Sequence, residues 1–296
     1  MAKNLPLILF AILGIVWGSN FIYMKWASEY LSDIQIVLIR VLFGFIPVLI
    51  YAMYLKVLKL EHLKYSFHFF IMSLLATTVY YYFFVKASSL LLSGVVGALS
   101  GTIPLFTFIL AVIFIKDEKI TPLRILGIAI GLLGVVLIAK PYDANLLETN
   151  IEGVIFAITG SLIIGISFVY AKRFISPLKI HFAALTSYQL GYALLILLFI
   201  TDYKGIENIL PHTHVFIGLV VGLGLLGTGL AFIIYYYLIE RIGAVNASSA
   251  TYLPPLVALF IAYFFVNENI TLVDLLATVL IFSGVFLINA KKKAQA

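Results

Sequence analysis

Long uncharged apolar runs, separated by short polar links, make up almost the whole chain. Each run has about 20 residues, which is the length that an α-helix needs to cross the hydrocarbon core of a bilayer. The links leave no room for a separate soluble domain, and the runs lack the alternating polarity of barrel strands. The pattern therefore predicts an all-α integral membrane protein with ten transmembrane helices, at residues 5–27, 34–55, 66–86, 91–115, 122–139, 151–171, 180–200, 213–238, 243–265 and 271–289.

One part of this pattern occurs twice. Residues 95–138 align with residues 245–288 without a gap, at an offset of 150 residues. At this offset Pro104 matches Pro254. Each copy belongs to a set of five predicted helices, and because five is an odd number, the second set would enter the membrane upside down. Inverted repeats of this kind are a design of secondary transporters. Duplication kept only for packing is the alternative.

We therefore expect two five-helix repeats with inverted topology, at 1–140 and 150–290. Positive residues predict how these repeats face the membrane, because cytoplasmic links carry an excess of Lys and Arg. With both termini in the cytoplasm, 14 of these residues fall on the inner side. Only four fall on the outer side: Lys25, Lys86, Lys140 and Lys204. The asymmetry predicts a multi-pass protein of the inner membrane with cytoplasmic termini.

The composition also indicates a membrane protein, and it excludes several other classes of protein and site. The chain is 63% hydrophobic and 11% charged, far below the share of charged residues in soluble domains. It has no cysteine, which excludes disulfides and thiolate metal sites, and we expect no cofactor. The net charge of +6 comes from residues between the apolar runs, so we expect lipid and a small-molecule substrate as partners, and no nucleic acid. A monomer suffices for such a carrier, and a homodimer is an open alternative.

Polar residues inside the first predicted helix are candidate substrate ligands. Trp17, Asn20 and Met24 fall on one helix face. An amide in hydrocarbon must find a partner, because leaving it bare costs several kcal/mol. Asn20 would hold a polar group of the substrate while Trp17 stacks on it. Equally, Asn20 would bond a neighbouring helix and Trp17 would anchor the bundle.

Two prolines at equivalent points of the repeats, Pro104 and Pro254, predict paired helix breaks, which often mark a transport site. Small and polar residues surround both breaks, and Ser248 and Tyr252 share a helix face. Close helix packing is the simpler explanation for the small residues. The full set of candidate substrate contacts is Trp17, Asn20, Tyr80, Tyr81, Tyr82, Ser100, Ser167, Tyr170, Tyr235, Tyr236, Asn246, Ser248 and Tyr252.

Charged residues are placed unevenly. Arg40 is the one charge well inside a predicted helix, about 10 Å deep at 1.5 Å per residue. A side chain of this length can extend to the interface, so an anchoring role is favoured over a functional one. Glu118 and Glu268 precede the fifth and tenth helices, where acids favour a helix start. All acids fall in links or at helix ends, which argues against a buried proton-carrying carboxylate and favours a neutral or zwitterionic substrate.

The motif WGSNF at residues 17–21, together with DE and NE before the fifth and tenth predicted helices, resembles the EamA-type family of the drug/metabolite transporter superfamily. The resemblance covers the whole chain. It implies a carrier of small metabolites, often an amino-acid exporter, with a central vestibule lined by spans one, three, four, six, eight and nine. The matching segment GISF at 165–168 lacks the Trp and the Asn, so any role of Trp17 or Asn20 has no mirror-image partner.

Amino-acid or amino-acid-derivative efflux by alternating access is thus the leading hypothesis. Exchange of another solute class, such as S-adenosylmethionine, a sugar nucleotide or a drug-like cation, is the alternative. A membrane-embedded enzyme or a lipid-handling protein is the hypothesis from outside transport. The chain has no phosphate loop, zinc spacing or nucleophile with a base, so we do not expect an enzyme.

Overall fold

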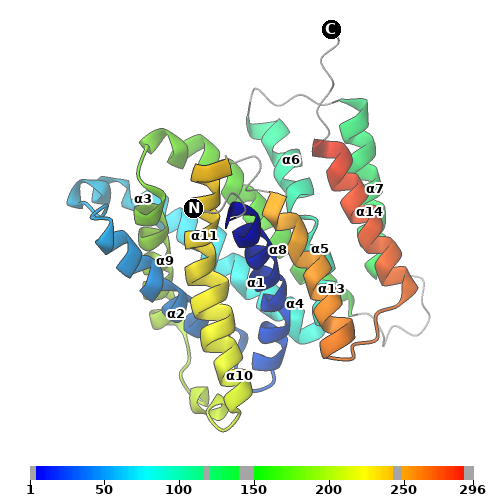
Figure 1. The fold of residues 1–296 in the computed structure, drawn as a ribbon, viewed down its shortest axis with the longest axis horizontal. Helices are drawn as coiled ribbons and strands as arrows, with labels where there is room; N and C mark the ends of the chain where they lie inside the picture. Colours follow the sequence, from blue (N-terminus) through cyan, green and yellow to red (C-terminus); the bar gives the residue numbers. More distant parts are fainter. Residues whose placement is uncertain (1–4, 116–120, 140–149, 243–248, 290–296) are drawn as a thin grey trace.

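The computed structural model describes residues 5–115, 121–139, 150–242 and 249–289, and within these ranges every regular element is helical. The α-helices are α1 (Leu5–Ala27), α2 (Asp33–Tyr54), α3 (Ser66–Ser73), α4 (Val79–Leu90), α5 (Ser93–Ser100), α6 (Ile103–Phe114), α7 (Pro122–Ala139), α8 (Ile151–Tyr170), α9 (Phe182–Ile200), α10 (Thr213–Ile217), α11 (Ala231–Ile242), α13 (Leu253–Phe265) and α14 (Leu272–Asn289) (Figure 1). Short 3₁₀ and π segments are η1 (Leu60–Tyr65), η2 (Leu74–Thr78), η3 (Ala171–Ile175), η4 (Ser176–Leu178), η5 (Ile206–Ile209), η6 (Gly218–Leu230) and η7 (Ser249–Tyr252).

The predicted class is confirmed: the chain is an all-α integral membrane protein. Seven helical stretches are long and apolar enough to cross a membrane, and three shorter apolar helices accompany them. Each of these stretches overlaps one of the runs predicted from the sequence. Because only seven stretches among the described residues have the length of a full span, the ten-span, five-plus-five arrangement stays a prediction.

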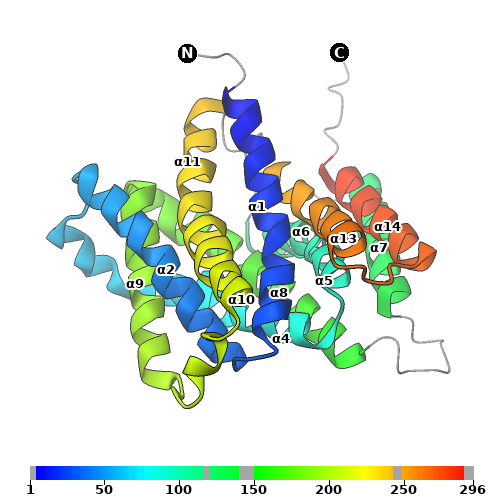
Figure 2. The same cartoon turned by 60° about the horizontal axis from the view of Figure 1, so that its bottom comes forward.

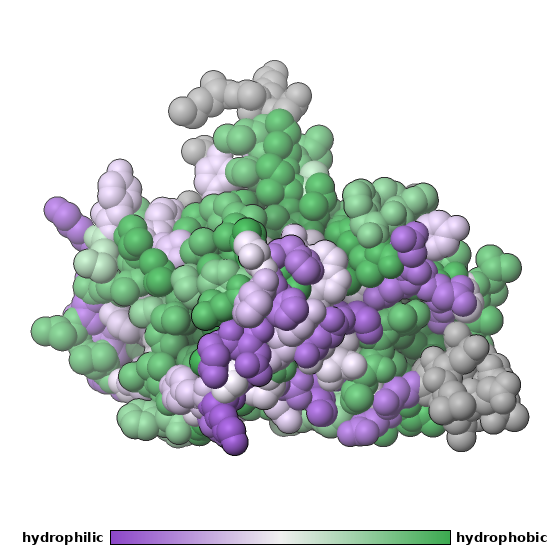
Figure 3. Space-filling view, turned by 90° about the horizontal axis from the view of Figure 1, so that it is seen from below, coloured by the Kyte–Doolittle hydropathy of each residue, from purple (hydrophilic) through white to green (hydrophobic). Residues whose placement is uncertain are grey.

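Large apolar side chains on the outside of the bundle fit a lipid environment. Phe199 is 88% exposed, Phe286 is 73% exposed and Leu7 is 70% exposed, which would leave extensive apolar surface in water. Polar residues gather instead in the middle of the face formed by the end of α1 and the link between α9 and α10, with apolar residues around them (Figure 3). Exposed residues at these ends include Glu29, Asp202, Lys204 and Glu207.

Helix packing follows the same plan in the two parts of the chain. α2 packs against α9, α5 packs against α13, and α7 packs against α14 at one side of the molecule (Figure 1). α8 packs against α4 and α6, while α1 packs against η6 and α13. A shift of about 150 residues turns the contact of α8 with α4 into that of α1 with α11, and the contact of α8 with α6 into that of α1 with α13.

Irregular backbone occurs at matching points of this plan. The π segments η2 and η6 both interrupt a long helix, and residues 74–78 of η2 correspond to residues 224–228 within η6. A break separates α5 from α6, and the 3₁₀ turn η7 precedes α13. Pro104 and Pro254 lie in the first turn of α6 and α13, just after each break. The prolines therefore start a helix rather than bend one, because a first-turn residue needs no N–H partner.

Figure 2 shows the start of α1 and the end of α14 on the same side of the bundle, as Figure 1 also does. The described chain thus enters and leaves its helices on one face.

Candidate functional site

Arg40 lies inside the bundle and does not extend to the surface. Its side chain belongs to α2 and is 5% exposed. The Nε atom donates a hydrogen bond to Thr228 Oγ1 at 3.0 Å, and an Nη atom donates to Met24 Sδ at 3.7 Å. The guanidinium carbon lies 3.6 Å from the centre of the Tyr81 ring. The expectation that this residue anchors the chain at the interface is therefore wrong, because α1, α4 and η6 enclose it.

No acid faces this cation in the part of the chain that the structure describes. The two ion pairs found there join Lys59 to Glu61 and Lys86 to Asp33, both at helix ends. A buried charge without an opposite charge is expensive, since desolvation is not offset by Coulomb attraction. An arrangement of this kind inside a membrane marks a functional site by default.

Asn20 lies on the same face of α1, one turn before Met24. It is 5% exposed, and its Oδ1 atom receives no hydrogen bond among the described residues. It packs directly on the backbone of Gly227, where a Cβ atom would lie 2.2 Å from Oδ1. Glycine at 227 thus permits the close approach of Asn20 to η6, next to the residue that holds Arg40.

Trp17 and Tyr235 contact each other through their rings. Their ring centres are 5.5 Å apart at an interplanar angle of 52°. Both pack against a cluster of buried apolar residues from α1, α11 and η7 that includes Leu13 and Ala250. The contact fits the anchoring interpretation of Trp17 at least as well as a stacking role. Tyr252 is half-buried nearby in η7.

The tyrosines at 80–82 point in different directions, as expected from consecutive helix positions. Tyr81 is buried under Arg40. Tyr80 packs on Tyr81 and on Phe84, with ring centres 5.1 Å apart in both cases. Tyr82 packs on its neighbour Phe83. Tyr81 is therefore the member of this run whose ring contacts Arg40.

Two of the three candidate serines form hydrogen bonds within their own helices. Ser100 donates to Gly97 O at 2.6 Å, and Ser167 donates to Ile164 O at 2.7 Å. Tyr170 lies at the end of α8, where its hydroxyl is 2.7 Å from His68 Nδ1. The side chain of Tyr236 and residues Asn246 and Ser248 lie outside the described residues. The roles of all these residues stay predictions.

The sequence pattern did not single out Thr228, Gly227 or Thr77. Thr77 Oγ1 accepts a hydrogen bond from Gln189 Nε2 at 2.7 Å, which links η2 to α9. Thr228 and Thr78 match across the repeat, and the hydroxyl of Thr78 is buried without a partner among the described residues. Two matched threonines in otherwise apolar helices were the available signal.

Glu268, which lies in the second half of the chain, caps the start of α5 in the first half. The sequence suggested that this acid starts the helix that follows it, but the structure shows a different partner. Its carboxylate accepts hydrogen bonds from Ser93 N at 2.9 Å, Ser93 Oγ at 2.9 Å and Gly94 N at 3.1 Å, at the start of α5. The start of α14 is instead capped by Asp274, which accepts from Thr271 N at 2.9 Å. Glu118 lies outside the described residues.

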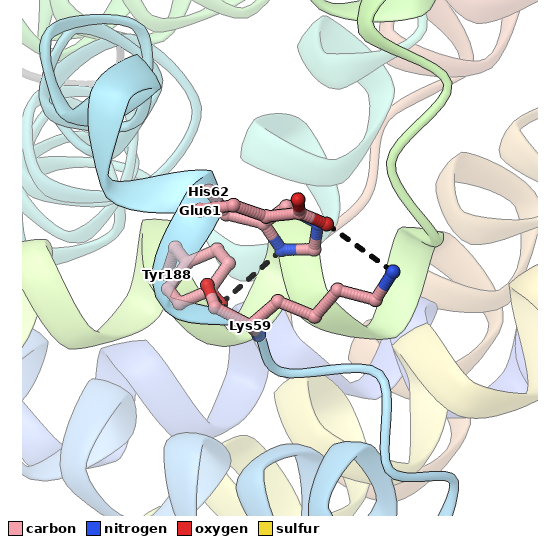
Figure 4. A network of polar contacts seen from close by, with 4 residues as sticks. All are labelled: Lys59, Glu61, His62 and Tyr188. Carbon is pink, nitrogen blue, oxygen red and sulfur yellow. Dashed lines mark hydrogen bonds and ion pairs between the residues drawn. The ribbon is translucent and has the colours of Figure 1, made fainter.

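Two of the histidines at helix ends pack against tyrosines. His212 stacks on Tyr30 with ring centres 3.8 Å apart, and His62 is 9% exposed. Figure 4 shows His62 beside Tyr188 of α9, at an Nδ1 to hydroxyl distance of 3.3 Å. The same hydroxyl accepts from Lys59 N at 3.0 Å and lies 3.1 Å from Lys59 O, to which it donates. Tyr188 therefore fixes the link between α2 and η1.

We expect Tyr188→Phe to lower the free energy of unfolding by about 1 kcal/mol, because the Lys59 backbone groups lose their partner. Thermal unfolding of the purified protein measures this, and hydrogen exchange at the Lys59 amide should rise. Tyr192→Phe is the matched control, one turn further along α9, since the structure records no hydrogen bond from the Tyr192 hydroxyl to any described residue. Equal effects of the two changes would contradict the role of Tyr188 in holding this link.

Comparisons with known proteins agree with this architecture. The profile of the EamA-like transporter family matches residues 4–140 and again residues 151–290. The chain is 26% identical over 276 residues to YoaV of Bacillus subtilis (strain 168), described as an uncharacterized transporter, covering 92% of both chains. It is 31% identical over 202 residues to YedA of Escherichia coli (strain K12), described as an uncharacterized inner membrane transporter, covering 68% of this chain and 63% of YedA.

One solved crystal structure supports the fold alone. It is 17% identical to this chain, covers 97% of each chain and superposes with a TM-score of 0.61. The two matches of the family profile together span nearly all of the sequence. The chain therefore belongs to the EamA-like transporter family and is a membrane transporter.

Proposed function

We propose that this transporter exports small polar metabolites, amino acids or their derivatives, across the inner membrane by alternating access. The observation that carries the proposal is the pairing of helix irregularities. The π segments η2 and η6 correspond across the repeat offset, and so do the breaks before α6 and α13. Interrupted helices at equivalent points of two halves are where transporters build a substrate site and move around it.

The two halves, 1–140 and 150–290, would be inverted repeats. Two separate matches of the family profile support this division. Exchange of the halves also preserves two of the main helix contacts: α4 on α8 becomes α11 on α1, and α6 on α8 becomes α13 on α1. In such an arrangement one half opens inward by the movement that opens its partner outward.

The central site would be lined from α1, η2–α4, α5, α8, η6–α11 and the segment before α13. The buried polar groups of Asn20, Arg40, Thr78 and Thr228 support this position. The described spans hold no acid away from their ends, which favours a neutral or zwitterionic solute over a drug-like cation. Another solute class remains the second candidate, and a buried cation suits an anionic member of it.

Transport in vesicles tests the proposal. We expect proteoliposomes that contain the purified chain and an internal pool of the twenty L-amino acids to exchange at least one of them for its labelled form outside. Matched vesicles with Gly227→Leu should lose this exchange, because the new side chain would occupy the space of Asn20. Absence of exchange for every amino acid, with exchange of a sugar nucleotide or S-adenosylmethionine, would favour the second candidate.

Both termini would face the cytoplasm, since the start of α1 and the end of α14 lie on one side and basic residues are denser there. We expect a C-terminal alkaline phosphatase fusion to be inactive and a C-terminal green fluorescent protein fusion to fluoresce. An active phosphatase fusion would mean that the chain has the opposite orientation in the membrane.

A further inference from the structure

We propose that Arg40 binds the carboxylate of the transported solute and that Asn20 Oδ1 accepts a hydrogen bond from its amino group, so that this cluster recognises the head group of an α-amino acid. The inference rests on the transport function proposed above and assigns its binding residues. Its support comes from two buried groups, Arg40 and Asn20, that contact adjacent residues of η6. One is a cation without an acid, and the other is an acceptor without a donor, within the described residues.

A guanidinium has five N–H groups, and a purely structural one should find acceptors for them. Arg40 makes one hydrogen bond to a hydroxyl and one long contact to a thioether, which is a weak acceptor. In the part of the chain described, its remaining N–H groups have no protein acceptor. Such a side chain is fixed in position while some of its N–H groups lack a hydrogen-bond acceptor. In a structural salt bridge these groups are paired with an acid, whereas in a binding site for an anion they await the ligand.

The contacts that hold Arg40 leave the edge of its guanidinium available for a ligand. The Tyr81 ring covers one face of the planar guanidinium, with 3.6 Å from the guanidinium carbon to the ring centre. Thr228 fixes the Nε position. Contacts of this kind restrict the rotation of the group and leave N–H groups at its edge to form the paired hydrogen bonds that a carboxylate accepts.

The single positive charge of Arg40 favours a ligand group with a single negative charge. Arg40 is the one Lys or Arg among the contacts described for Tyr81, Thr228 and Met24. A carboxylate would neutralise it, whereas a phosphate dianion would leave a net negative charge among apolar helices. A solute without a negatively charged group would leave the guanidinium without a counter-charge. A carboxylate is therefore the anion that fits.

Asn20 supplies the second half of the recognition. Asn20 and Met24 are four residues apart on α1, about 6 Å along the helix axis, and Met24 contacts Arg40. Asn20 packs on Gly227, next to Thr228, which bonds Arg40. An acceptor and a cation that contact adjacent residues of η6 suit the ammonium and the carboxylate of one small zwitterion. The substrate side chain would lie outside this cluster, so the cluster recognises the head group rather than the identity of the amino acid.

Binding to the purified full-length chain tests this inference apart from transport. The probes are the twenty L-amino acids, their carboxamides and their desamino carboxylic acids, and the readout is the ligand-dependent rise in unfolding temperature. We expect at least one amino acid to bind and its carboxamide to bind at least about tenfold more weakly, the scale of a lost charge-assisted pair. Arg40→Gln should abolish this acid-over-amide preference without weakening the carboxamide. The control is Arg173→Gln, which removes an exposed guanidinium and should leave the preference unchanged.

The second variant tests the amino group independently. Asn20→Ala should abolish the preference for the amino acid over its desamino acid and keep the preference for acid over amide. Ligand-free Arg40→Gln should unfold at the same temperature as the natural chain or above it, because an uncompensated buried charge is removed. An acid-over-amide preference that survives Arg40→Gln would overturn the inference while leaving transport intact. A large loss of stability in Arg40→Gln, with an unchanged head-group preference in Asn20→Ala, would assign both residues a structural role. If no amino acid binds or is exchanged, the proposed substrate class fails together with the inference.

Discussion

Replacement of Gly284 by alanine is expected to separate α14 from α7 and to lower the free energy of unfolding by about 1–3 kcal/mol, the usual cost of overpacking a tight core. A Cβ atom at this position would lie 2.4 Å from Gly127 O, 2.6 Å from Gly131 N and 2.8 Å from Gly131 Cα. All three neighbours are backbone atoms, so no side chain can rotate to make room. Close backbone approach through small residues is how helices associate in membranes, where no hydrophobic force draws them together.

Gly191→Ala is the control for this change. Gly191 also lies in a membrane helix, but its nearest neighbours are carbons of the Phe45 ring at 3.6 and 3.7 Å, an ordinary contact distance. Alanine should be tolerated there or slightly stabilising, because it favours helix more than glycine does. Thermal unfolding in detergent measures both variants. A Gly284→Ala protein as stable as the Gly191→Ala protein would show that the backbones of α7 and α14 do not approach this closely.

The sequence predicted the helices well because span length is set by the bilayer rather than by tertiary contacts. Runs of about 20 apolar residues form helices, since a helix satisfies its backbone polar groups within one segment in lipid, whereas a barrel needs shorter strands of alternating polarity. The breaks at Pro104 and Pro254 were visible for the same local reason. The π segments were not predicted, although five of the 13 residues of η6 are glycine, which weakens a regular α-helix. Their geometry depends on which helices pack against them.

The candidate site was predictable only in part. Asn20 stood out as an amide within an apolar run, and its burial agrees with that expectation. The depth of Arg40 was also predicted, but its direction was not, since a long side chain at that depth can extend outward or inward. Its partners lie on other helices, and Thr228 is 188 residues away. The same limit applies to Glu268, whose partners lie 174 and 175 residues away.

Removal of the Glu268 carboxylate is expected to loosen the start of α5 rather than the start of α14. The carboxylate is 8% exposed and accepts three hydrogen bonds from Ser93 and Gly94. Negative charge at a helix N-terminus is favourable, and donors left without an acceptor in a buried place cost about 1–3 kcal/mol. Glu268→Ala should therefore lower the free energy of unfolding by roughly this amount, and Glu268→Gln by less, because the amide oxygen still accepts.

Hydrogen exchange decides between the two helices that this acid could support. In Glu268→Ala we expect faster exchange at the amides of Ser93 and Gly94, while the start of α14 keeps its protection through Asp274 and Thr271. Glu207→Gln is the control, since Glu207 is an exposed acid in the first turn of η5 and should change neither stability nor exchange at α5. Loss of protection confined to the start of α14 would mean that Glu268 serves its own helix. Loss at α5 would show that one half of the transporter caps a helix of the other, so that relative movement of the halves must keep or break this contact.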